Sequence, residues 1–191
     1  MGMPDAGPRR LTGFEQVLLG VIADQPRSGY GLKKMFSSSP ASVYQPSPGA
    51  LYPALRRLEG RGLLRAERTV SSGGRAQRVY TVTGPGREVH LAWLRQPVVP
   101  ATVALDLELH LMRFTHMENA LPRAEVIGFL TDLAAALRGF VASMEQFRPT
   151  AQKSGGQHGP LALEHGIAVY RASLRWTESA IATLSEPPAG R

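Results

Sequence analysis

Two apolar stripes near the start of the chain have the three- and four-residue spacing of helices. The first covers residues 12–23, where Thr12 and Glu15 form the pattern of a capping box. The segment "QPRSG" then breaks the chain, and Ser28 can cap a second, shorter helix. The apolar face of that second helix consists of Leu32, Met35 and Phe36.

A third helix is predicted within the stretch "SPGALYPALRRLEGRGLL". Ser47 is placed to be its N-cap, and Pro48 takes the first helical position, where a missing N–H costs nothing. Gly60 and Gly62 offer a left-handed stop at its end. The core-facing side repeats at i, i+4 and i+7, as Leu51, Leu55 and Leu58.

Two strands follow, at residues 63–70 and 78–83, and the glycine-rich segment "SSGGRAQ" connects them. Thr83 can cap a closing helix that runs to Leu94, and "RQPVVP" ends the domain. Three helices, a hairpin wing and a closing helix predict a winged helix-turn-helix over residues 10–96.

The second half predicts helices throughout. Residues 100–116 carry apolar residues on more than one face, which is typical of a buried helix, and residues 148–160 are expected to be a loop. Two long helices flank that loop with spacings that alternate between four and three. Their seam residues are Val126, Leu130, Leu133, Leu137, Phe140, Met144 and Phe147, then Leu163, Ile167, Tyr170, Leu174, Thr177, Ile181 and Leu184.

These long helices can pair within one chain or with a second copy. Both carry further apolar residues off the seam, which favours a dimer. The predicted fold is mainly α with a small β-wing, and the second domain is an antiparallel helical dimerisation domain over residues 97–186, followed by a disordered tail at 187–191. The predicted dimer interface consists of Leu163, Ile167, Tyr170, Leu174, Ile181 and Leu184.

Charge is divided unevenly along the chain. The net charge is +7, and residues 1–96 hold 14 Lys and Arg against 6 Asp and Glu. Residues 56–78 alone contain seven arginines. Such a cluster attracts polyanions, although an ordinary solvated surface would look the same by charge alone.

Other classes of protein lack support in the sequence. There is no cysteine, so disulfides and thiolate metal sites are excluded. No signal-peptide pattern and no uncharged apolar run of about 18 residues is present, which predicts a cytoplasmic protein that uses no membrane. The histidines (His90, His110, His116, His158, His165) form no metal motif, and no nucleotide or hydrolase motif occurs. We therefore expect neither an enzyme nor a cofactor.

The blocks "SGYGLKKMF", "SPGALYPALRRLEGRGLL" and "GGRAQRVYTVTGPGRE" resemble those of PadR-family transcriptional regulators over about residues 12–95. "LALEHGIAVYRASLRWTESAIATL" is similar to the last helix of the subfamily with a long C-terminal helical domain. Tyr44 stands where the family often has Trp. The resemblance implies these DNA-binding residues: Tyr30, Lys33, Lys34, Ser47, Gly49, Tyr52, Arg56, Arg57, Gly73, Gly74, Arg75 and Arg78.

Individual roles remain open at this point. Arg57 is interpreted as a phosphate contact, whereas Arg56 could contact phosphate or read guanine in the major groove. Arg75 at the wing tip could enter the minor groove or remain solvated, and Tyr30 could contact DNA or be structural.

The resemblance further implies a homodimeric repressor on a palindromic operator in double-stranded DNA, associated with the nucleoid when bound. It also implies release by a small aromatic or lipophilic effector, with a candidate pocket of Trp93, Phe114, Phe140, Tyr170 and Trp176. Two alternatives are a winged helix that contacts proteins and an RNA-binding protein. RNA binding would normally need exposed aromatic side chains that stack on bases, and the basic half has none apart from Tyr44 and Tyr52.

Overall fold

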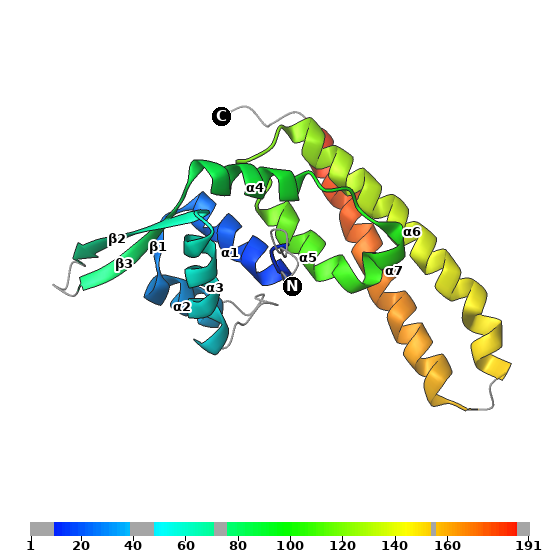
Figure 1. Ribbon diagram of the computed structural model, residues 1–191. Coiled ribbons are helices and arrows are strands. Elements are labelled where there is room, and N and C mark those ends of the chain that lie inside the picture. Colours follow the sequence, from blue (N-terminus) through cyan, green and yellow to red (C-terminus); the bar gives the residue numbers. More distant parts are fainter. Residues whose placement is uncertain (1–9, 39–47, 71–75, 154–155, 187–191) are drawn as a thin grey trace, which may run out of the picture. The chain divides into compact units, whose positions relative to one another are not determined.

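The computed structural model describes residues 10–38, 48–70, 76–153 and 156–186. The chain divides into two compact units, Met1–Leu94 and Arg95–Arg191. Figure 1 shows short helices and a β-hairpin in the first unit and two long helices in the second. The predicted fold class, mainly α with a small β-wing, is confirmed.

The first unit has the element order of a winged helix. β1, β3 and β2 form an antiparallel sheet in that order, with Leu64 opposite Val82 at the base of the hairpin. The short strand β1 was not predicted from the break "QPRSG", because two residues carry no periodicity and only pairing with β3 defines them. The elements are α1 (Gly13–Asp24), β1 (Arg27–Ser28), α2 (Gly29–Ser38), α3 (Pro48–Gly60), β2 (Leu64–Val70), β3 (Ala76–Val82) and α4 (Gly84–Leu94).

Three predicted helix caps are present. The hydroxyl oxygens of Thr12, Ser28 and Thr83 each accept a hydrogen bond from a backbone N–H three residues later, at 3.1–3.2 Å. At α1 the capping box is complete, since Glu15 accepts in return from the Thr12 backbone at 2.9 Å. The predicted N-cap of α3, Ser47, lies outside the described residues.

α3 ends as its glycines predict. Gly62 has a φ of 70°, in the left-handed region that glycine adopts without strain. Its backbone N–H donates to Glu59 O at 2.9 Å, and the N–H of Leu63 donates to Leu58 O at 3.0 Å. This pair of bonds is a Schellman motif, which stops the helix and turns the chain into β2.

The predicted core face of α3 is buried against the other helices of the first unit. Leu51, Leu55 and Leu58 are each no more than 1% exposed. On the neighbouring helices the rings of Phe14 and Phe36 meet at 5.9 Å between centroids. Burial of one side of α3 fixes which of its other side chains face outward.

The second unit is built on a helical hairpin, in which α6 and α7 run side by side in opposite directions (Figure 1). The predicted loop at residues 148–160 is wrong at both ends, because α6 continues through Pro149 to Lys153 and α7 begins at His158. A proline this close to a helix end removes only one internal bond, and Ala151 is buried there. The elements are η1 (Pro100–Thr102), α5 (Val103–Thr115), α6 (Arg123–Lys153) and α7 (His158–Ser185).

The predicted heptad seam holds this hairpin together. Its first four positions on α6, from Val126 to Leu137, are all buried, and Ile167 on α7 is 1% exposed. Towards the other end, Phe140 and Tyr170 pack edge to face at 4.8 Å. The seam opens at Phe147, which is 56% exposed.

α5 is less completely buried than its composition predicts. Leu105 is 86% exposed, while the polar side chains of His110 and Arg113 are buried. The Arg113 guanidinium lies 4.6 Å over the Phe129 ring and donates a hydrogen bond to Gln96 O. Burial lowers the pKa of Arg113 to about 10.

By length and composition alone, α6 is apolar enough to cross a membrane. Within the described residues, 44% of its most apolar window is buried by the protein itself. A core helix of a helical unit has the same properties, so this is weak evidence for a membrane span.

Candidate nucleic-acid interface

One side of α3 is exposed and carries the residues that the sequence predicts to meet DNA. Gly49, Tyr52 and Arg56 follow one another at spacings of three and four, and they lie on the side away from the buried leucines. Arg56 makes no hydrogen bond or ion pair with any residue that the structure describes. None of the described residues therefore occupies the donors of its guanidinium.

Tyr52 also contacts α2. A Cβ added at Gly29 would lie 2.9 Å from Cε1 of Tyr52, so the ring packs directly on the glycine backbone. The tyrosine nevertheless keeps 41% of its surface exposed. On α2 itself, Tyr30 is 71% exposed and Lys33 and Lys34 are exposed, as a helix that crosses a DNA backbone requires.

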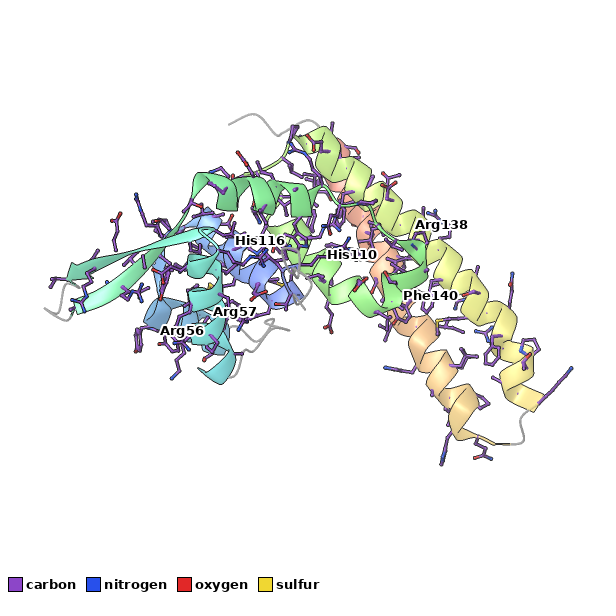
Figure 2. All side chains as sticks on the ribbon, in the orientation of Figure 1. Arg56, Arg57, His110, His116, Arg138 and Phe140 are labelled. Atoms are coloured by element: carbon purple, nitrogen blue, oxygen red, sulfur yellow. The ribbon has the colours of Figure 1, made fainter. Side chains whose placement is uncertain are left out.

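Arg57 is engaged differently from its neighbour. Its Nε donates to Oε1 of Glu15 at 2.7 Å, and the Glu15 side chain is only 6% exposed. Figure 2 labels Arg56 and Arg57 on α3. Burial by itself raises the pKa of Glu15, but hydrogen bonds from Thr12 and Arg57 outweigh burial and lower it. The carboxylate is therefore ionised at neutral pH.

Arg78 ties the wing to the end of α3. Its Nη2 donates to Oε1 of Glu59 at 2.6 Å, and its guanidinium carbon lies 5.6 Å from the centre of the Tyr80 ring. About half of the Arg78 side chain remains exposed. The sequence did not identify Glu15 and Glu59 as partners of arginines in the site. No motif links either carboxylate to an arginine so far along the chain.

Arg68 is a further residue that sequence reasoning left out of the site. The register of β2 and β3 places Arg68 directly opposite Arg78, on the same face of the hairpin. The alternation of side chains along the two predicted strands, once the strands are paired as a hairpin, was the signal that could have identified Arg68. The predicted wing-tip residues Gly73, Gly74 and Arg75 lie outside the described residues.

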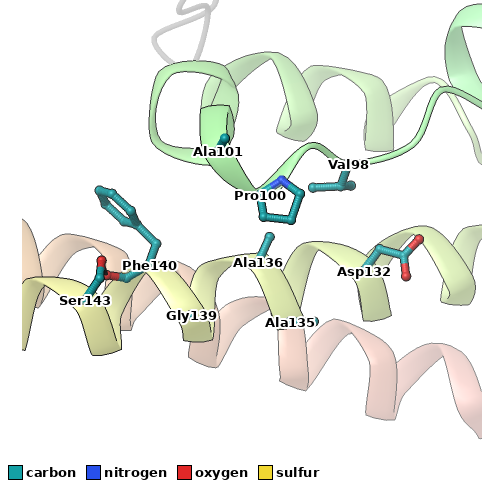
Figure 3. A pocket seen from close by; sticks show the side chains of 9 residues that line it. All are labelled: Val98, Pro100, Ala101, Asp132, Ala135, Ala136, Gly139, Phe140 and Ser143. Atoms are coloured by element: carbon teal, nitrogen blue, oxygen red, sulfur yellow. Dashed lines mark hydrogen bonds between the residues drawn. The ribbon is translucent and has the colours of Figure 1, made fainter.

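The predicted effector residues fall into separate groups. Phe114 meets Trp176 edge to face at 5.5 Å, and Phe140 meets Tyr170. Phe114 lines a hollow of about 570 Å³, and Phe140 lines another of about 670 Å³ beside Pro100 and α6, shown in Figure 3. Trp93 is 3% exposed beside His90 and lines neither hollow.

Among the residues that the structure describes, no three His, Asp or Glu side chains are grouped so that they could hold a metal ion.

A helix with a free basic edge, a wing and a backbone-crossing helix define the winged-helix class of DNA-binding proteins. The model of the "Transcriptional regulator PadR-like family" matches residues 18–91, which span most of this unit. Residues 18–91 therefore form a PadR-like domain, and the chain is a DNA-binding transcriptional regulator.

The similarity to one curated relative extends over both units, whereas that to another is confined to a short stretch. The probable transcriptional regulator Rv1176c of Mycobacterium tuberculosis is 23% identical over 181 residues, 88% of this chain and 96% of that protein. The transcriptional regulator Rv3488 of the same organism is 57% identical over 44 residues, 23% of this chain and 40% of that protein. A crystal structure of Bacillus subtilis PadR in complex with operator DNA matches with 19% identity and a TM-score of 0.44, over 91% of this chain and 99% of that one.

Proposed function

We propose that this regulator reads a specific, palindromic operator as a homodimer and represses transcription from it. The observation that carries the proposal is the exposed stripe of Gly49, Tyr52 and Arg56 on α3. A glycine in the first turn lets the backbone N–H groups come close to a phosphate. One turn beyond Tyr52, Arg56 makes no hydrogen bond to any of the residues described, so its guanidinium can reach DNA. The proposal places the protein in the cytoplasm, on the nucleoid when bound, and assigns it no catalytic activity.

The test is selection of bound duplexes from a random DNA pool, followed by binding measurements with the selected sequence at several salt concentrations. We expect an inverted repeat with half-sites about one helical turn apart, and affinity that falls linearly with salt on a logarithmic scale. A pool that stays random would contradict sequence-specific reading and favour a winged helix that contacts proteins.

We expect Arg56→Gln to weaken operator binding by about tenfold or more, because it removes an exposed guanidinium from the edge of α3 that faces away from the core. A base contact would relax the sequence preference at one position, whereas a phosphate contact would lower the salt slope by about 0.9. Binding to operator and to scrambled duplex, at matched salt, separates the two. An unchanged affinity for both duplexes would remove Arg56 from the interface.

The dimer is proposed to form through an exposed apolar stripe on α7. Leu161, Val169 and Trp176 return to the same side of the helix at spacings of eight and seven, and their exposed fractions are 66%, 42% and 40%. Of the residues predicted from the seam, Ile167 is already buried within this chain. The other predicted interface residues are half-buried and remain candidates for the edge of the interface: Leu163, Tyr170, Leu174, Ile181 and Leu184.

We expect Val169→Glu to weaken dimerisation by at least about tenfold, because an unpaired carboxylate would be buried at the interface. Sedimentation over a range of protein concentrations measures the effect. Ala182→Glu places the same charge at another exposed position of α7 and should leave the dimer intact. A Val169→Glu protein that dimerises like the parent would rule out this stripe, and a monomeric parent would rule out the dimer.

A small aromatic or lipophilic effector completes the proposal. It is supported by the two hollows that contain Phe114 and Phe140 in the helical unit. One solved Bacillus subtilis PadR structure, with 18% identity, is a complex with p-coumaric acid. An effector would cause the protein to release DNA only if it bound the conformation that does not bind DNA more tightly than the conformation that does.

A further inference from the structure

Glu15 has more partners than a helix cap needs. One carboxylate oxygen, Oε2, completes the capping box with the backbone and hydroxyl of Thr12, at 2.9 and 3.2 Å. The other, Oε1, accepts from Nε of Arg57, which lies 42 residues further along the chain. A cap would be satisfied by one oxygen, so the second bond serves a different purpose.

The position of this bond in the fold suggests what that purpose is. Glu15 lies in the first turn of α1, and Arg57 lies in the last turn of α3, so the bond joins two helices whose leucines share one core. Glu15 is 4% exposed, and without Arg57 its Oε1 would lose the hydrogen bond from Arg57 Nε, which is costly for a buried carboxylate. This cost favours arrangements in which α3 keeps Arg57 within reach of α1.

Helix geometry separates Arg57 from the DNA-facing stripe. Successive residues of a helix point about 100° apart, so Arg56 and Arg57 cannot face the same surface. Arg56 continues the stripe of Gly49 and Tyr52, whereas Arg57 points toward the α1 side. Its side chain remains 57% exposed, but its Nε is committed to Glu15.

We propose that the Glu15–Arg57 pair is a positioning device that fixes the orientation of α3 for reading DNA, and that Arg57 is not itself a phosphate contact. The inference rests on the proposed function, because it assumes that α3 is the element that reads the operator. It differs from the role that the sequence alone suggested for Arg57.

The experiment is a double-mutant cycle on the full chain with Glu15→Gln, Arg57→Gln and the double variant. Gln at position 15 retains a capping-box acceptor, so α1 should still be capped. Binding to the selected operator and to a scrambled duplex is measured at several salt concentrations. Arg56→Gln is the matched control, because it removes the same charge one residue away on α3 and leaves the Glu15–Arg57 bond in place.

We expect each single variant to lose about tenfold in operator affinity. The double variant should lose no more affinity than the single variant with the larger loss, because both substitutions remove the same bond. The salt slopes should equal that of the parent. The proposal is overturned if Arg57→Gln lowers the salt slope by about 0.9 while Glu15→Gln binds like the parent. That pattern would make Arg57 a phosphate contact.

Amide hydrogen exchange of the free protein gives a readout that needs no DNA. The amides of α3 should exchange faster in Glu15→Gln and Arg57→Gln than in the parent and Arg56→Gln, while those of α6 should not change. If the parent shows no operator preference, the proposed function fails, and exchange alone then decides the positioning role. Equal α3 exchange in all four proteins would overturn it.

Discussion

Gly86→Ala is expected to destabilise the winged-helix unit by about 3 kcal/mol or more, because a methyl group has no space there. A Cβ at Gly86 would lie 2.1 Å from the carbonyl oxygen of Leu63 and 2.9 Å from Cγ2 of Val82. The obstacle is backbone, and the same carbonyl accepts a 3.1 Å hydrogen bond from Thr83 N, so it cannot move freely.

The same helix offers a matched control for this substitution. A Cβ at Gly84 would meet nothing within 4 Å, so Gly84→Ala should be neutral or stabilising by about 0.5 kcal/mol. Chemical unfolding followed by circular dichroism gives both free energies. Equal stabilities of the two variants would show that α4 can move away from Leu63 and β3 at little cost.

The functional reading of Gly86 follows from its neighbours. Thr83 Oγ1 accepts from Gly86 N and donates to Gly62 O at 2.6 Å, so one hydroxyl connects the end of α3 to the start of α4. A shift of α4 would therefore disturb α3 and the base of the wing. We expect Gly86→Ala to lose operator binding together with stability.

Leu133→Ala is expected to cost about 2–5 kcal/mol in the helical unit, since it opens a cavity in the middle of the α6–α7 hairpin. Leu133 is fully buried, and Leu130 and Leu137 on the same seam are also fully buried. The unfolding transition must be compared at one protein concentration, because any dimer makes stability depend on concentration.

Leu105→Ala is the control for this second substitution. Leu105 belongs to the same unit and is 86% exposed, so its truncation should change stability by less than about 0.5 kcal/mol. A similar loss in both variants would mean that Leu105 is covered by a partner in solution. No loss in either would mean that the hairpin seam contributes little to folding.

The arginine cluster shows how the structure changes the meaning of a charge count. Among the described members, Arg57, Arg65 and Arg78 form ion pairs with Glu15, Glu67 and Glu59. Exposed pairs such as Arg65–Glu67 contribute little to stability, but they reduce the field that a phosphate meets. Arg56 and Arg68 are therefore better candidates for contacts with DNA than the arginines that form these ion pairs.

Local sequence signals determined most of the secondary structure. The capping box at Thr12, the caps at Ser28 and Thr83 and the left-handed stop at Gly62 were all predictable. Each of these depends on residues that lie only a few positions apart, so backbone geometry brings the partners together in almost any fold. The α6–α7 seam was predictable for a related reason, since its spacing encodes a face.

Only the tertiary structure decided which of the described arginines of α3 and the wing bond to carboxylates in other elements. The Arg57–Glu15 and Arg78–Glu59 bonds join residues 42 and 19 positions apart, across different elements. No periodicity records such partners, because they depend on how α1, α3 and β3 pack against one another. The sequence by itself determined the helices, the wing and their basic character, and packing decided that Arg56 faces outward while Arg57 bonds to α1.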